Sequence, residues 1–180
     1  MRFATPFVVA LSVAMVPAAG MAESPASACS QDVPAVLRAP AGNALAFEVQ
    51  AEGVQIYGCA ASGGAFAWAF QAPEARLLGP GGRAVGKHYA GPTWEASDGS
   101  KVTGAKVEGA TPDPAAIPWL LLRTASHAGS GRMGEVTFVQ RLRTAGGNAP
   151  ATGCDAAHVG AIARVPYRAA YCFYRAGAGN

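Results

Sequence analysis

From residue 45 onward, short runs with alternating hydrophobic and polar positions follow one another, and most are closed by glycine, proline, serine or aspartate. Before residue 111 these runs are LAFEVQ, VQIYGCA, FAWAFQ, ARLLG, RAVGKHYA, TWEA and KVTGAKVEGA. A period of two is typical of half-buried β-strands, and the residues between the runs favour tight turns. Many short strands separated by turns predict an all-β domain, either an antiparallel β-sandwich or a flattened barrel.

The longest predicted strands lie in the last third of the chain. IPWLLLRTASHAG and GEVTFVQRLRTAGG face each other across Gly129-Ser130-Gly131, which predicts a β-hairpin. ARVPYRAAYCFYRA follows, and its aromatic residues indicate a central or interface-forming strand. Asp113 and Pro114 predict one short helical turn, since aspartate caps a helix and proline fits its first turn, while Pro118 limits its length.

The first 22 residues have a different pattern. Arg2 precedes an apolar run from Phe7 to Val16 that is too short to span a bilayer, and small residues lead to Ala22. This pattern is that of a signal peptide, so we predict cleavage after Ala22 and a periplasmic or secreted protein. Residues 23–33 then form a flexible leader and 34–180 a single β domain. We expect no membrane span, because no later stretch is long and apolar enough.

Charge narrows the range of partners. The chain has 14 Lys and Arg against 11 Asp and Glu, a net charge of +3, and removal of Arg2 with the signal peptide leaves +2. The charges are scattered, so we expect no nucleic acid partner. The 23 glycines and 13 prolines favour many turns, and the 51% hydrophobic content argues against disorder.

The four cysteines, Cys29, Cys59, Cys154 and Cys172, all follow the predicted cleavage site. An even number of cysteines in an exported protein predicts two disulfides, for which three pairings are possible. Their separations of 30, 95 and 18 residues lack the paired spacing of a zinc site. We therefore predict neither a metal site nor a cofactor.

The segment GKHYAGPTWEASDG concentrates residues that can bind or react. Its candidate site residues are His88, Tyr89, Trp94, Glu95 and Asp98. Neighbouring strand residues point to opposite faces, so at most half of this set shares one surface. We predict a binding protein for a small polar ligand or glycan, with an accessible Trp94 that stacks on the ligand. Trp68 and Trp119 lie in apolar runs and are predicted to be core residues.

Two other functions remain open. In a hydrolase, His88 would work with Glu95 or Asp98 as a general acid or base, and a metal-dependent enzyme would also recruit His127 or His158. No two of the histidines have the spacing of metal ligands. A structural cell-envelope or interaction domain is the third hypothesis, and it predicts no pocket.

Four motifs carry a resemblance to a known family. GKHYAGPTWEASDGSKVTG, PWLLL, TAGGNAP and VPYRAAYCFYR follow in this order, and together they resemble the DUF3455 family of exported proteins over roughly residues 34–175. The resemblance assigns no activity, because that family is a domain of unknown function. QIYGCA and TGCDAAHVG also belong to the shared pattern. The resemblance thus implies a Cys59–Cys154 disulfide and an additional Cys29–Cys172 disulfide.

Overall fold

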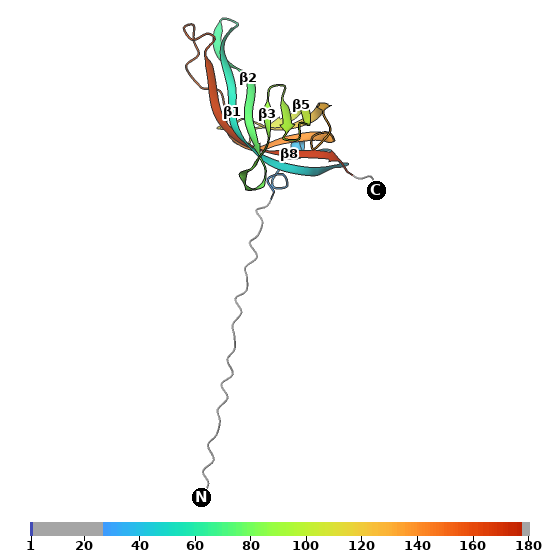
Figure 1. Ribbon diagram of the computed structural model, residues 1–180. Helices are drawn as coiled ribbons and strands as arrows, with labels where there is room; N and C mark the ends of the chain where they lie inside the picture. Colours follow the sequence, from blue (N-terminus) through green and yellow to red (C-terminus); the bar gives the residue numbers. More distant parts are fainter. Residues whose placement is uncertain (2–26, 178–180) are drawn as a thin grey trace.

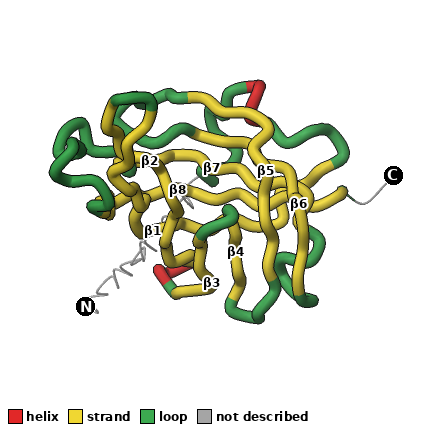
Figure 2. Tube along the Cα trace, turned by 90° about the horizontal axis from the view of Figure 1, so that it is seen from above, coloured by secondary structure: helices red, strands yellow, loops and turns green. Residues whose placement is uncertain are grey.

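The computed structural model describes residue 1 and residues 27–177, in which eight antiparallel strands form a closed ring. The strands are β1 (Asn43–Ser62), β2 (Ala65–Leu78), β3 (Ala84–Tyr89), β4 (Thr93–Ala96), β5 (Lys101–Ala110), β6 (Trp119–Ala128), β7 (Val136–Gly146) and β8 (Ile162–Ala176). Each strand pairs with the next in sequence, and β8 closes the ring by pairing with β1. Figure 2 shows this ring from above. The predicted all-β antiparallel fold is confirmed.

Strand β1 is one continuous strand where the sequence pattern suggested two. It pairs with β8 along most of its length and with β2 from Gln50 onward. Gly53 permits this close pairing, since a Cβ atom there would lie 2.1 Å from the Glu74 carbonyl oxygen of β2. The β1–β2 hairpin extends well beyond the short strands β3 and β4 (Figure 1). The wall of the ring is therefore taller at β1 and β2 than at β3 and β4.

The ring has an apolar inner face and, over β6, β7 and β8, an apolar outer face as well. The inner cluster draws buried residues from every strand except β3, among them Trp94, Val139 and Phe173, and Val85 of β3 packs against it. On the outer side, Leu37 packs with Trp119, as part of a separate cluster that also holds Cys29, Leu121, Leu142 and Cys172. The segment that contains the 3-10 helix η1 (Ala35–Leu37) thus covers the outside of these strands. Burial on both faces explains the uninterrupted WLLL run in β6.

Two disulfides tie distant parts of the chain together, and both pairings implied by the family resemblance are confirmed. Cys59 of β1 is bonded to Cys154 in the loop before β8, and Cys29 is bonded to Cys172 of β8. Disulfides persist in oxidising compartments, so they indicate a location outside the cytoplasm. The predicted signal peptide and its cleavage site after Ala22 lie outside the described residues.

The predicted turn near Asp113 forms, although it is a single turn that is not continued as a helix. The Asp113 carboxylate accepts the Ala115 N–H at 2.8 Å, and the Asp113 carbonyl accepts the Ala116 N–H at 3.2 Å. The Ile117 N–H is donated to the Gly146 carbonyl, so the turn ends there. The two 3-10 turns lie elsewhere, at η1 and at η2 (Pro80–Gly82). No helix in the described part of the chain is long and apolar enough to cross a membrane.

Candidate functional site

The predicted site residues on β3 and β4 are divided between the two faces of the sheet. His88 lies opposite Trp94 in the β3–β4 ladder, and Lys87 lies opposite Glu95. Because side chains alternate along a strand, His88 and Trp94 point into the ring while Glu95 points outward. The sequence prediction that at most half of the set shares one surface agrees with this arrangement.

The outward-facing group forms a surface cluster around Glu95. Its carboxylate accepts the Tyr89 hydroxyl at 2.8 Å and lies 3.4 Å from the ammonium groups of both Lys87 and Lys101. The hydrogen bond from Tyr89, helped by the two cations, holds the pKa of Glu95 below its usual value. The hypothesis that Glu95 orients His88 for acid–base chemistry is therefore wrong, because the sheet separates them.

Asp98 organises turns. Its carboxylate accepts the hydroxyl and the N–H of Ser100, at 2.5 and 2.9 Å, and the Arg132 N–H at 2.8 Å. These hydrogen bonds, chiefly that of the Ser100 hydroxyl, lower the pKa of Asp98. Since they join the β4–β5 turn to the β6–β7 loop, the structure assigns Asp98 a structural role. It lies apart from His88 and Trp94.

The inward-facing group is an aromatic stack. The rings of His88 and Trp94 lie 4.5 Å apart and nearly parallel, and Tyr171 of β8 meets both rings edge-on. Trp94 is only 1% exposed, so the prediction of an accessible tryptophan is wrong. Its neighbours cover it because β4 lies between two strands of a closed ring.

His88 is neutral at physiological pH. Burial, together with the nearby positive charge of Arg141, lowers the pKa of His88 to about 3 against the opposing effect of the Thr93 carbonyl. The Nδ1 atom lies 2.8 Å from that carbonyl oxygen, which can only accept a hydrogen bond. Nδ1 therefore carries the proton, and Nε2 is left as an acceptor.

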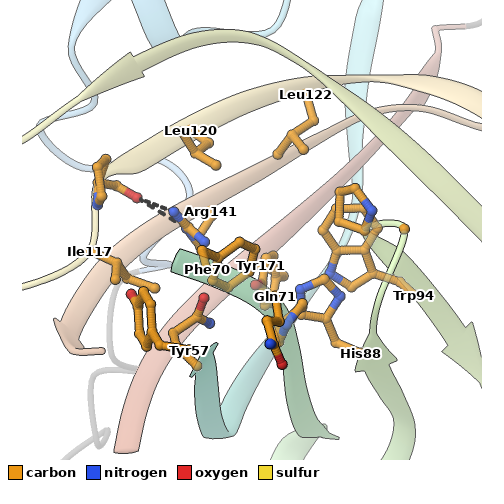
Figure 3. Close-up of a pocket in the computed structure, with 15 residues that line it drawn as sticks. Tyr57, Phe70, Gln71, His88, Trp94, Ile117, Leu120, Leu122, Arg141 and Tyr171 are labelled. Atoms are coloured by element: carbon orange, nitrogen blue, oxygen red, sulfur yellow. Dashed lines mark hydrogen bonds between the residues drawn. The ribbon is translucent and has the colours of Figure 1, made fainter. Parts of the chain in front are cut away.

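A cavity of about 400 Å³ opens beside this stack. Seven of the eight strands contribute side chains to it directly, all except β5, and the β3–β4 turn and the β5–β6 loop add others. It is lined by Gln55, Tyr57, Phe70, Gln71, Pro73, His88, Gly91, Pro92, Trp94, Ile117, Pro118, Leu120, Leu122, Arg141 and Tyr171 (Figure 3). Apolar side chains form most of the wall. The third hypothesis, a structural domain, predicted no pocket, and the cavity counts against it.

Three polar atoms in the cavity wall have no hydrogen-bond partner. They are the amide nitrogen of Gln55, the indole nitrogen of Trp94 and the hydroxyl of Tyr171, in side chains that are at most 2% exposed. Burial raises the pKa of Tyr171, so its hydroxyl keeps its proton and can donate. Tyr57, by contrast, donates its hydroxyl to the Gly147 carbonyl at 2.7 Å. The three atoms are fully buried, so they lie behind the surface of the cavity wall, and the Tyr171 hydroxyl lies close to the side chains of Arg141 and Trp94.

Arg141 of β7 adds a positive charge to the same wall. Its Nε and Nη2 atoms donate to the Pro118 carbonyl at 3.0 and 2.8 Å. Figure 3 shows the guanidinium between this carbonyl and the side chains of Phe70 and Tyr171. The charge of Arg141 acts on Tyr171, whose pKa it lowers against the larger effect of burial. Guanidinium and phenol are therefore close neighbours.

Sequence reasoning missed Arg141, Tyr171 and Gln55. A signal existed for Arg141, since it stands two positions after buried Val139 and therefore points to the same inner face of β7. Trp119 is buried as predicted, but Trp68 is only half-buried and donates its indole N–H to the Thr152 carbonyl at 2.9 Å. Trp68 lies on the projecting β1–β2 hairpin, away from the core.

Metal-ligating side chains are not grouped in the described residues: no three histidine, cysteine, aspartate or glutamate side chains there could hold an ion together. His158 hydrogen-bonds its neighbour Asp155 at 2.7 Å, and His127 lies 2.8 Å from the Val136 carbonyl. The three histidines are thus engaged separately.

Fold and site together define a disulfide-bonded domain with a closed ring of eight β-strands and an internal cavity. The chain belongs to the DUF3455 family, whose model matches residues 40–175 and is described as a protein of unknown function. No curated protein and no solved structure matches the chain.

Proposed function

We propose that this protein binds a small, largely apolar molecule inside the ring, in the cavity beside His88 and Trp94. The observation that carries the proposal is the cavity itself, about 400 Å³ in volume and lined mostly by apolar and aromatic side chains. Pockets with such a lining and a few polar groups are the usual sites of small molecules in proteins.

The composition of the wall supports an apolar body over a glycan. Phe70, Ile117, Leu120 and Leu122 line the cavity, and they offer no partner to a hydroxyl group. A sugar would bury several hydroxyls against these side chains, each at a cost in free energy. The cavity volume of about 400 Å³ is also in the usual range for small-molecule sites.

The two disulfides support a site of action outside the cytoplasm. With the predicted signal peptide, we place the mature protein, beginning at Glu23, in the periplasm or outside the cell. The proposed role there is to bind and retain a small molecule. This role requires no metal ion or cofactor.

A titration with the neutral fluorophore N-phenyl-1-naphthylamine tests the proposal. Saturable binding is expected, with enhanced and blue-shifted emission as the dye leaves water. Leu120→Phe adds a ring to the cavity wall and should weaken binding roughly tenfold or more, by analogy with the 1–3 kcal/mol cost of overpacking.

Val107→Phe is the matched control, because Val107 is 48% exposed and lies outside the cavity. It adds the same ring type on the surface and should leave the affinity unchanged. Circular dichroism checks that both variants fold. Absence of saturable binding to the wild-type protein, or equal affinity in a folded Leu120→Phe variant, would refute the proposal.

A further inference from the structure

We infer that the ligand is an organic monoanion with an apolar body, and that Arg141 holds its anionic group. This inference rests on the proposed function and specifies the chemistry of the same cavity. Among the residues that line the cavity, Arg141 carries the only formal charge, since His88 is neutral. No aspartate or glutamate lines the cavity.

The positive charge of Arg141 has no carboxylate partner in residues 27–177. Seven ion pairs occur there, and none includes Arg141. Its hydrogen bonds go to one backbone carbonyl, that of Pro118. A partly buried charge beside an apolar wall is costly unless it is paired, so a bound anion would stabilise it.

The Arg141 guanidinium has N–H donors that the Pro118 carbonyl does not use. Arginine carries five N–H donors, and the Pro118 carbonyl accepts two of them, one from Nε and one from Nη2. The remaining three suffice for one carboxylate or sulfonate. Because Nε and Nη2 are held at one carbonyl, the planar group has a fixed orientation and loses little freedom when an anion binds.

The Tyr171 ring lies beside this charge in the cavity wall, and its buried hydroxyl is close to the guanidinium. A carboxylate or sulfonate group accepts four or more hydrogen bonds, and those from a guanidinium are strengthened by its charge, whereas a neutral carbonyl accepts at most two. One guanidinium balances a single negative charge, and the apolar residues Leu120 and Leu122 of β6 favour a hydrocarbon or aromatic body.

Two dyes with a shared body separate this inference from the proposed function. 1-Anilinonaphthalene-8-sulfonate carries one negative charge, and N-phenyl-1-naphthylamine is the same ring system without it. Both are titrated against the wild-type protein and Arg141→Met, which removes the charge and keeps an apolar side chain. Arg123→Met is the control, since Arg123 is exposed on β6 and its loss changes the net charge equally.

Arg141→Met should weaken binding of the sulfonate dye roughly 10- to 100-fold, the range for hydrogen bonds to a charged group. Binding of the neutral dye should weaken far less than binding of the sulfonate dye in this variant, and Arg123→Met should bind both dyes as the wild type does. If Arg141→Met alters neither affinity, or alters both equally, the anion assignment is overturned while cavity binding stands. If neither dye binds the wild-type protein, both proposals fail.

If Arg141→Met does not fold, a ligand-competition assay on the wild-type protein tests the role of the negative charge. Octanoate and octanamide have the same chain, and only octanoate is charged at neutral pH. Octanoate should displace N-phenyl-1-naphthylamine at a concentration at least about tenfold lower than octanamide. Displacement by both at equal concentration would overturn the role of the charge.

Discussion

The neutral, buried His88 makes the stability of the protein depend on pH in a defined window. The unfolded chain binds a proton at this histidine below about pH 6.5, whereas the folded protein does not until about pH 3. The free energy of the unfolded state therefore falls relative to that of the folded state as the pH falls through this interval. Stability should be highest above pH 6.5 and should decline steadily below it.

The size of the effect follows from these two pKa values. At pH 5 the unfolded histidine is almost fully protonated and the folded one almost fully neutral. Each pH unit in the window changes the free energy of unfolding by at most 1.36 kcal/mol. Integrated from pH 8 to pH 5, the loss is about 2 kcal/mol. The pKa values of Glu95 and Asp98 lie below 4.5 and 3.8, so these groups titrate mostly at lower pH.

Urea unfolding of the oxidised protein at pH 8, 7, 6 and 5 measures this loss. His88→Asn is the informative variant, because its amide can still donate to the Thr93 carbonyl but does not titrate. It should be less stable than wild type at pH 8, since the stacking on Trp94 is lost, yet nearly independent of pH down to 5. His158→Asn, on the surface, leaves His88 in place and should keep the wild-type slope.

Equal slopes in the wild-type protein and His88→Asn would refute the reasoning. That result would mean that the folded protein protonates His88 near pH 6.5, and thus that water or a rearranged ring solvates the imidazolium. The aromatic stack described above would then not exclude solvent in the way its burial indicates.

Two further predictions concern the disulfides and the outer surface. Replacement of both Cys59 and Cys154 by alanine opens a loop of 95 residues. It should lower the free energy of unfolding, measured in urea titrations, by about 2–5 kcal/mol. A loss well below this range would show that other contacts hold the loop before β8. Glu95→Gln should leave the affinity for N-phenyl-1-naphthylamine unchanged, because Glu95 lies on the outer face of the sheet, and a clear loss of affinity would relocate the binding site to that face.

Local periodicity was enough to predict the strand regions, although β1 and β2 were each divided into two runs, and to put His88 and Tyr89, like Trp94 and Glu95, on opposite faces. It also predicted the β6–β7 hairpin, whose strands pair between residues 120–123 and 138–141. These features depend on neighbours in sequence. The turn at Asp113 stays a single turn because the next N–H, that of Ile117, is donated to a distant carbonyl, that of Gly146.

The cavity could not be predicted in the same way. Gln55, Arg141 and Tyr171 are far apart in sequence, and they meet only because β8 returns to pair with β1. Periodicity places a residue on a face but does not say which residues lie opposite it across the ring. The burial of Trp94 was missed for the same reason, since Tyr171 of β8 is one of the rings that cover it.

The closure of the ring by β1 and β8 also determines how late in synthesis the fold can form. Strand β1 begins at Asn43, and its partner β8 ends at Ala176, so one of the longest ladders in the molecule joins the two ends of the domain. Such non-local pairing slows folding, because the intervening chain must be ordered first. Cys29 and Cys59 are synthesised long before Cys154 and Cys172, and a bond between the first two would have to be exchanged. Refolding of the reduced chain should therefore benefit from a disulfide isomerase, whereas the oxidised chain starts with its ends already joined.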